Sequence, residues 1–274
     1  MPDPSPWITV GELAHAFALD SNAPQPTADL AGRKFIFSLE NGQTIEYGFL
    51  RGDTLSWRIL EGTDKGLGAE ESCSVFKIRE EIYFVDYVRR EEPIASVTLV
   101  FDFGRKILTA LFGRLPEASE TKISLLERIS TGRELTDVEA GFLSGAIDAD
   151  FTDSTPRHPT TDDLVGRRVE YTYSPTEKYE HIYLNERFYT WHCLLGSEKG
   201  LADTDRCHYF KVAEELYLFV WREKIIPTLG VVMVDFDRKR TAGKIFGYEG
   251  GESGRVANFP VGALAQLLNV TRRD

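Results

Sequence analysis

Short runs of aromatic and β-branched residues recur along the chain, with turn residues between them about every ten positions. Side chains of these types fit a pleated, half-buried surface, so strands are predicted over residues 35–39, 44–49, 54–59, 82–88 and 96–103. Tight turns such as Asn41-Gly42 join the runs and favour antiparallel meanders. Closing each meander into a barrel would remove its exposed edge strands.

The same pattern occurs twice, at an offset of 134 positions. Between residues 30 and 97, 19 of 68 aligned positions are identical, whereas unrelated sequences of ordinary composition would share roughly 4. The identical pairs include Leu30 with Leu164, Gly32 with Gly166, Trp57 with Trp191, Gly62 with Gly196 and Tyr83 with Tyr217. Agreement of this size indicates an internal duplication of one β-rich module.

The duplication provides a domain map. We predict an N-terminal segment with a short helix at 1–28, a first barrel at 29–116, a helical connector and linker at 117–161, a second barrel at 162–250, and a C-terminal helix and tail at 251–274. Helices are expected where apolar spacing or a capping box suggests them, at 10–17, 117–150 and 261–268. The fold class is therefore mainly β, with two tandem antiparallel calycin or lipocalin-like barrels and short flanking helices. A barrel of about eight strands can hold one small ligand.

Composition and charge exclude several classes of function. The net charge is −11, and the resulting repulsion opposes binding to nucleic acid or to an anionic membrane. The three cysteines, Cys73, Cys193 and Cys207, lack the number and spacing of a disulfide framework or a zinc cage. No apolar run is long enough to span a bilayer, and no signal-peptide pattern is present. We therefore expect a cytoplasmic protein with neither nucleic-acid nor membrane partners.

Motifs for common cofactors and catalytic centres are also absent from the sequence. It contains no GxGxxG, P-loop, GxSxG or HExxH motif. None of the five histidines stands at helical i, i+4 spacing from another metal-ligand residue. We expect no cofactor and no metal. The sequence leaves the oligomeric state open.

Candidate chemistry gathers in the second copy, where alternate strand residues share a face. These sets are Tyr171 with Tyr173; Tyr179, His181 and Tyr183; Thr190, His192 and Leu194; and Trp221 with Glu223. If these faces point inward, the barrel would hold phenols, imidazoles and a carboxylate among aromatic walls, as in a small-molecule site. Burial would raise the pKa of Glu223 towards neutrality and suit it to proton transfer. A register shift of one residue would instead turn every one of these groups to water, so the surface alternative stays open.

The first copy differs at these positions. It has Phe37 for Tyr171, Leu39 for Tyr173, Arg58 for His192 and Arg89 for Glu223. The acid–base set is therefore confined to the second copy, and the first copy is interpreted as a structural or regulatory partner.

Conserved-looking segments of the two copies resemble a known family. These are the LxGR start (Leu30 to Arg33 and Leu164 to Arg167), the tryptophan followed by a KGL segment, and the DFxRK turn. They resemble the tandem MoaF-like (molybdenum cofactor biosynthesis protein F-like) proteins, which have an N-terminal and a C-terminal MoaF domain. The resemblance covers nearly the whole chain apart from the segment between the copies. It implies the two-barrel organisation, whereas the family name reflects an operon association and implies little about chemistry.

A more distant resemblance concerns the second copy. Leu164-Val165-Gly166, Tyr171-Thr172-Tyr173 and Trp221-Arg222-Glu223 occur in the order seen in phenolic acid decarboxylases. In those lipocalin-like enzymes the paired tyrosines hold the substrate and the glutamate donates a proton. The resemblance therefore implies these roles for Tyr171, Tyr173 and Glu223. Their substrate-carboxylate arginine has no equivalent at Gly200-Leu201-Ala202, which puts decarboxylation itself in doubt.

The resulting hypothesis is a cofactor-independent lyase, isomerase or cyclase of specialised metabolism that acts on a phenolic, enolic or aromatic-conjugated molecule. The expected catalytic residues are Glu223, Tyr171, Tyr173 and His192. The expected ligand contacts are Tyr179, His181, Tyr183, Trp191 and Trp221. Its partner would be a small aromatic or hydrophobic molecule. The alternatives are a non-catalytic calycin-type binding or regulatory protein, and an interaction module with solid barrels.

Overall fold

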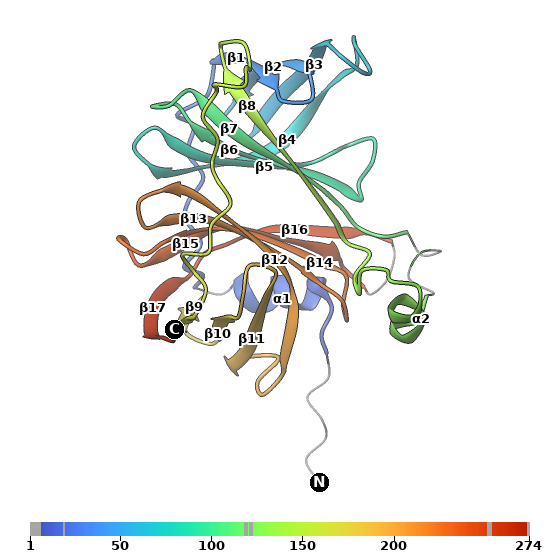
Figure 1. Ribbon diagram of the computed structural model, residues 1–274, viewed down its shortest axis with the longest axis vertical. Helices are drawn as coiled ribbons and strands as arrows, with labels where there is room; N and C mark the ends of the chain where they lie inside the picture. Colours follow the sequence, from blue (N-terminus) through green and yellow to red (C-terminus); the bar gives the residue numbers. More distant parts are fainter. Residues whose placement is uncertain (1–6, 19, 118–119, 121–122, 251–253, 273–274) are drawn as a thin grey trace. The chain divides into compact units, whose positions relative to one another are not determined.

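The computed structural model describes residues 7–18, 20–117, 120, 123–250 and 254–272. It is mainly β and contains two closed antiparallel barrels of eight strands each, as the sequence predicts (Figure 1). The chain divides into two compact units. One unit comprises residues 25–114 and 140–159, and the other comprises the described parts of 1–24, 115–139 and 160–274.

The first barrel closes between its first and last strands. Its strands are β1 (Lys34–Leu39), β2 (Thr44–Arg51), β3 (Thr54–Glu61), β4 (Gly68–Arg79), β5 (Ile82–Val88), β6 (Ala95–Asp102), β7 (Ile107–Arg114) and β8 (Glu139–Ile147). Each pairs with its neighbour in this order, and Phe37 of β1 lies opposite Ile147 of β8. The interior is filled by aromatic and aliphatic side chains such as Phe35, Phe37 and Phe101.

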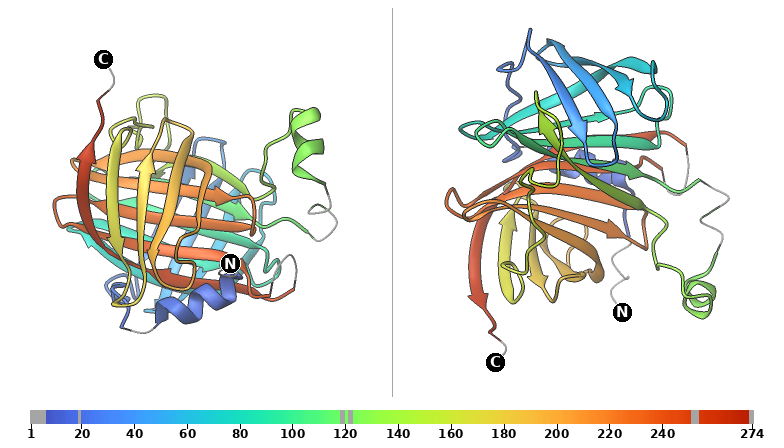
Figure 2. Two further views of the ribbon diagram at one scale, coloured as in Figure 1. Left: turned by 90° about the horizontal axis from the view of Figure 1, so that it is seen from below. Right: turned by 45° about the horizontal axis from the view of Figure 1, so that its top comes forward.

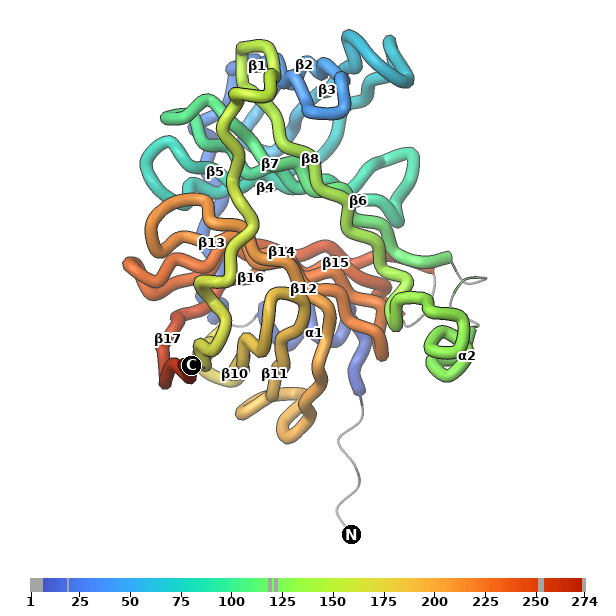
Figure 3. The backbone as a smooth tube through the Cα atoms, in the orientation of Figure 1, coloured from blue at the N-terminus to red at the C-terminus, as the bar shows by residue number. Residues whose placement is uncertain are grey.

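The segment between the two copies differs from the prediction. Among the described residues of this segment, helix is confined to α2 (Leu125–Ser130), which Ser124 caps by accepting the backbone N–H of Glu127. The helix predicted over the rest of 117–150 is wrong, because residues 139–147 form β8. Figure 3 traces the chain from β7 through α2 and back into the first barrel as β8. Without β8 the outer edge of β1 would lack hydrogen-bond partners, and that requirement outweighs local helix signals.

The second barrel repeats the architecture. Its strands are β9 (Arg167–Thr172), β10 (Lys178–Tyr183), β11 (Phe188–Leu195), β12 (Ala202–Ala213), β13 (Leu216–Glu223), β14 (Thr228–Asp235), β15 (Arg240–Tyr248), β16 (Val256–Val261) and β17 (Leu264–Val270). Strand β15 pairs with β14, β16 and β17, and β17 pairs with β9, which closes the barrel. Strands β16 and β17 are successive halves of one path, separated at Gly262 and Ala263.

The C-terminal helix predicted within 251–274 is wrong, because its described part forms β16 and β17. The helical spacing came from Leu264, Leu267 and Leu268, which are all partly exposed. The residues that the barrel buries are the alternating Val261, Ala263 and Ala265. Their period of two is that of a strand.

The short helix predicted near the N-terminus is confirmed as α1 (Val10–Ala18). Thr9 and Glu12 form a reciprocal capping box at its start: the Glu12 carboxylate accepts the Thr9 N–H, and Thr9 Oγ1 accepts the Glu12 N–H. The helix buries Val10 and Phe17 and lies beside β15 and β16 of the second barrel (Figure 2). No helix in the described ranges is long and apolar enough to cross a membrane.

Candidate functional site

The interior of the second barrel contains a cavity of about 40 Å³. Its walls come from strands β10, β11, β13, β14 and β15 and from the segments beside them. The N-terminal segment and α1 close it, through Ile8, Val10, Leu13 and Phe17. The remaining lining residues are Tyr173, Tyr179, His181, Tyr189, Trp191, Glu198, Trp221, Glu223, Ile226, Thr228 and Ile245.

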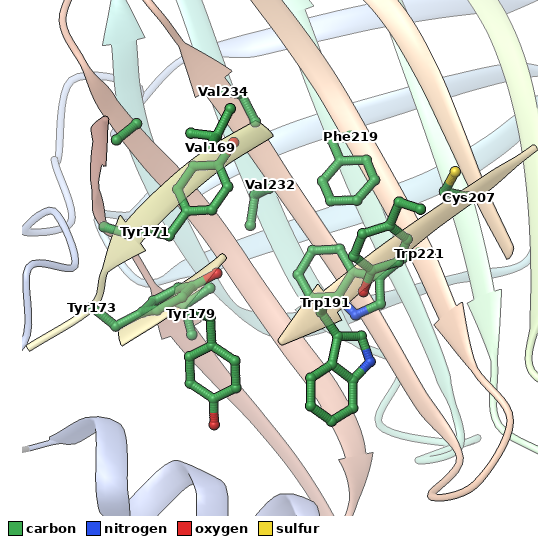
Figure 4. Close-up of a cluster of buried hydrophobic side chains, with 14 of the residues drawn as sticks. Val169, Tyr171, Tyr173, Tyr179, Trp191, Cys207, Phe219, Trp221, Val232 and Val234 are labelled. Carbon is green, nitrogen blue, oxygen red and sulfur yellow. The ribbon is translucent and has the colours of Figure 1, made fainter. Parts of the chain in front are cut away.

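Strand register brings most of the sequence-predicted site residues together. Tyr171 and Tyr173 point inward, as do Tyr179, His181 and Tyr183, and all are buried. Trp191 and Trp221 also point inward, and Figure 4 shows them in the same interior as Tyr173 and Tyr179. The Tyr179 and Trp191 rings are 6.2 Å apart between centroids, so the aromatic wall is continuous on this side.

His192 lies elsewhere. It belongs to the outer face of β11, where its Nδ1 lies 2.9 Å from Glu180 Oε1, and Arg168 pairs with the same carboxylate. The inward placement expected for Thr190, His192 and Leu194 is therefore wrong. Residues 189, 191 and 193 of β11 point inward instead, and alternation then requires 190, 192 and 194 to point outward.

Three carboxyl groups around the cavity each accept a hydrogen bond from an aromatic side chain. Trp221 Nε1 donates to Glu223 Oε1 over 2.8 Å. Trp191 Nε1 donates to Asp205 Oδ2 over 3.1 Å, and Tyr179 Oη donates to Glu198 Oε2 over 3.0 Å. The aromatic residues therefore form the walls and also fix the positions of the acids.

The environments of Glu223 and Asp205 differ, and so do the shifts in their pKa values. Burial raises the pKa of Glu223 well above its ordinary range, and the neighbouring charge of Asp205 raises it further. Burial raises the pKa of Asp205 to about 6, against the attraction of Lys224, whose Nζ lies 3.2 Å from Asp205 Oδ1. The surroundings of Glu223 therefore favour its protonated form, whereas Lys224 favours the ionised form of Asp205.

Glu198 connects the closing segment to the cavity. Its carboxylate accepts hydrogen bonds from Tyr179 and from the backbone N–H of Ile8. Burial nevertheless raises the pKa of Glu198 above its ordinary value.

The phenols of this interior are neutral hydrogen-bonding groups. Burial raises the pKa values of Tyr171, Tyr173 and Tyr189. Tyr171 Oη lies 2.7 Å from Tyr183 Oη, and neither residue lines the cavity. Tyr173, Tyr179 and Tyr189 do line it, so these are the phenols that can reach a ligand.

His181 is the imidazole that reaches the cavity. Burial lowers its pKa to about 3, so the ring is neutral. Its Nδ1 is buried and makes no hydrogen bond within the described structure. The ring lies 4.7 Å from that of Tyr171 and 6.0 Å from that of Trp221, between centroids.

Sequence reasoning missed Tyr189, Glu198 and Asp205. A signal for Asp205 was present: the aligned residue of the first copy is Glu71, which is also acidic and buried. An acid retained at a strand position in both copies suggests a constrained environment. Tyr189 aligns with Leu55 and gave no such signal.

Histidine, cysteine and acidic residues do not cluster as metal ligands in the part of the chain that the structure describes. No group of three or more such side chains there is arranged to hold a metal ion. The donors at the cavity are instead carboxyl groups paired with indole or phenol groups.

Fold and site together define a tandem β-barrel protein with an acidic, aromatic cavity in its second barrel. The chain belongs to the MoaF family: the MoaF N-terminal domain matches residues 5–117 and the MoaF C-terminal domain matches 158–271. It is 43% identical to Protein MoaF of Klebsiella aerogenes over 268 residues, 98% of this chain and 97% of that protein. Among solved structures, one of a candidate beta-lactamase from Burkholderia vietnamiensis matches 46% of this chain and 97% of its own, with 16% identity and a TM-score of 0.33.

Proposed function

We propose that this MoaF protein is a cofactor-independent enzyme, a lyase or isomerase, whose active site is the cavity of the second barrel. The observation that carries the proposal is the pair of carboxyl groups, Glu223 and Asp205, held by Trp221 and Trp191 in one aromatic interior. Two carboxyl groups whose environments separate their pKa values supply an acid and a base at the same pH.

The roles follow from the surroundings of each group. Glu223 donates a proton to the substrate, because burial and the neighbouring Asp205 raise its pKa and so favour its protonated form. Asp205, with a pKa of about 6, lies behind Trp191 rather than in the cavity lining, and it accepts a proton or stabilises positive charge once the aromatic walls open around the substrate. Tyr173, Tyr179 and Tyr189 orient a polar atom of the substrate. Tyr171 does not contact the substrate. Its hydroxyl is hydrogen-bonded to Tyr183, so it helps to position the interior side chains.

Access to the site requires α1 to move. The cavity of about 40 Å³ is far smaller than the roughly 300–1,000 Å³ typical of small-molecule sites. Val10, Leu13 and Phe17 occupy the space that a substrate ring would need. We therefore include in the proposal an open state in which α1 withdraws and the aromatic walls receive the substrate.

The test is exchange of carbon-bound hydrogen in deuterated water, with phenylacetone as a neutral, enolisable aromatic probe. Exchange at its α-carbon needs a base to remove the proton and an acid to polarise the carbonyl. We expect Glu223→Gln and Asp205→Asn each to lower the exchange rate by about 10²–10⁴-fold. Glu186→Gln, which removes a charge from an exposed turn of the same barrel, serves as the matched control and should leave the rate unchanged.

A non-catalytic small-ligand binding protein is the second candidate. It is favoured by one observation: all three carboxyl groups at the cavity already have a hydrogen-bond donor in the closed state. If the wild-type protein binds the probe yet gives no exchange above that of Glu223→Gln, the binding role replaces the enzymatic one.

A further inference from the structure

The cavity of the second barrel has an unbalanced set of charged groups. Glu198 and Glu223 line it, and Asp205 lies directly behind Trp191. Among the described residues that line the cavity, none is a lysine or an arginine. The one lining histidine, His181, is neutral. An anionic ligand would therefore meet no countercharge from the residues that line the cavity, and Lys224, outside that lining, is already paired with Asp203 and Asp205.

The walls of the cavity have the opposite preference. Trp191, Trp221, Tyr173, Tyr179 and Tyr189 present aromatic rings to the same small space. The face of an aromatic ring attracts cations, indole most strongly, and the attraction grows when water is excluded. Aromatic rings and carboxyl groups around one cavity form the kind of site that recognises an ammonium group.

The first barrel shows what occupies the equivalent position there. Arg89 aligns with Glu223, and Trp57 aligns with Trp191. The Arg89 Cζ atom lies 5.8 Å from the centre of the Trp57 ring, so the first copy places its own cation against this tryptophan. The second copy has Glu223 at the position of Arg89, so no arginine from this position fills its aromatic cage, and an external cation can bind there.

We propose that the ligand of the second barrel carries a protonated amine, which sits against the Trp191 and Trp221 rings with Glu223 and Asp205 as countercharges. The inference rests on the proposed function, because it names the substrate class of the same site. It extends the expectation of an aromatic or enolic substrate by adding a positively charged group.

The test is isothermal titration calorimetry with three probes of matched size: benzylammonium, benzyl alcohol and benzoate. We expect benzylammonium to bind at least about tenfold more tightly than the neutral alcohol, and benzoate most weakly. Because an incoming cation lowers the pKa of Glu223, binding should release protons, so the measured heat should differ between phosphate and Tris buffers.

Variants locate the bound amine. Glu223→Gln and Asp205→Asn should each weaken benzylammonium binding by about tenfold or more, since each removes a countercharge. Glu223→Arg copies the first barrel and should abolish binding of the amine, because the guanidinium would occupy the cage. Glu186→Gln, on the exposed turn, should change nothing. Circular dichroism and thermal unfolding establish that each variant is folded.

Two outcomes overturn the inference, and they differ in what they say about the proposed function. If benzoate binds as tightly as benzylammonium and Glu223→Arg strengthens it, the amine specificity is wrong, while the second barrel remains a ligand site. If the binding of all three probes is unaffected by every cavity variant, the ligand does not enter this barrel, and both proposals fail.

Discussion

Trp221 donates its indole N–H to the carboxyl group of Glu223 over 2.8 Å, from two positions earlier on the same strand. Both side chains point inward because strand residues two apart share a face. Gly230 on the neighbouring strand makes this possible: a Cβ there would lie 2.0 Å from the Trp221 ring. The ring therefore lies flat over a glycine, and its N–H is directed at the acid.

Replacing Trp221 should destabilise the second barrel, because its indole N–H makes this hydrogen bond, whereas replacing a tryptophan whose N–H makes none should not. In Trp221→Phe, Glu223 loses its indole donor while an aromatic ring remains. We expect the free energy of unfolding to fall by about 1–3 kcal/mol, the usual range for a buried polar group that loses its partner. The matched control is Trp57→Phe, because the Trp57 Nε1 is buried and makes no hydrogen bond within the described structure. Chemical denaturation should find the control nearly neutral; an equal loss in both variants would contradict the assignment.

Gly230→Ala should disturb the same pair from the opposite strand. The new methyl group would collide with the Trp221 ring, so the ring must rotate or β14 must shift. We expect a loss of about 1–3 kcal/mol from overpacking, and a changed near-ultraviolet circular dichroism spectrum. Gly250→Ala is the control, since a Cβ at Gly250 would meet nothing within 4 Å. An unchanged spectrum in Gly230→Ala would show that the ring does not rest on the glycine.

The periodicity of the strands gave much of this site from sequence alone. Alternation identified which residues of β9, β10 and β13 share a face, and the barrel closure turned those faces inward. The phase of β11 could not be fixed in this way, because Trp191 and His192 both look like site residues and only one of two neighbours can point inward. The register with β10 and β12 decides for Trp191.

Two other features depended on distant parts of the chain. Strand β8 is separated from its partner β1 by about a hundred residues, and only the unpaired edge of β1 calls for it. Which barrel α1 covers could not be predicted either, because nothing in residues 10–18 distinguishes the two barrels. By contrast, Asp205 could have been predicted from the sequence, since the aligned residue of the first copy, Glu71, is also acidic.

Closure by α1 predicts that weakening the helix will speed ligand entry. Phe17 packs against Tyr173 with 4.7 Å between ring centroids and is buried. If α1 unfolded only together with the whole barrel, Phe17→Ala would lower the free energy of unfolding of the protein by about 3–5 kcal/mol. We expect instead faster hydrogen exchange confined to α1 and faster association of benzylammonium in stopped-flow fluorescence.

His15→Ala is the control for that experiment, because His15 is exposed on the same helix. It should leave both the exchange and the association rate unchanged. If Phe17→Ala also leaves the association rate unchanged, the ligand enters by another route and α1 is not a lid.

Buried histidines should make the protein less stable in acid. The pKa of His181 is lowered from 6.5 to about 3, so its contribution to stability is complete above pH 6.5 and is lost as the pH falls. Between pH 6.5 and 4 the loss from this one group amounts to about 3 kcal/mol. His158 and His208, with pKa values lowered to about 4, act in the same direction.

Asp205 acts in the opposite direction. Its pKa is raised from 3.8 to about 6, so its contribution is complete below pH 4 and is lost as the pH rises through 6. Glu223, whose pKa is also raised, acts in the same direction as Asp205. The three histidines outweigh the two acids, and the thermal midpoint should fall between pH 6.5 and 4. The fall should be steeper in Asp205→Asn and shallower in His181→Gln. A fall of equal slope in all three proteins would contradict these protonation states.

The proposed mechanism requires a protonated carboxyl group in the second barrel, ready for proton transfer. A ¹³C NMR titration of protein labelled at the glutamate side-chain carboxyl carbon tests it most directly, with Glu223→Gln used to assign the signal. We predict that the Glu223 signal titrates at a higher pH than the signals of the exposed glutamates. A Glu223 signal that titrates together with those of exposed glutamates, near the ordinary value of about 4.3, would contradict the account.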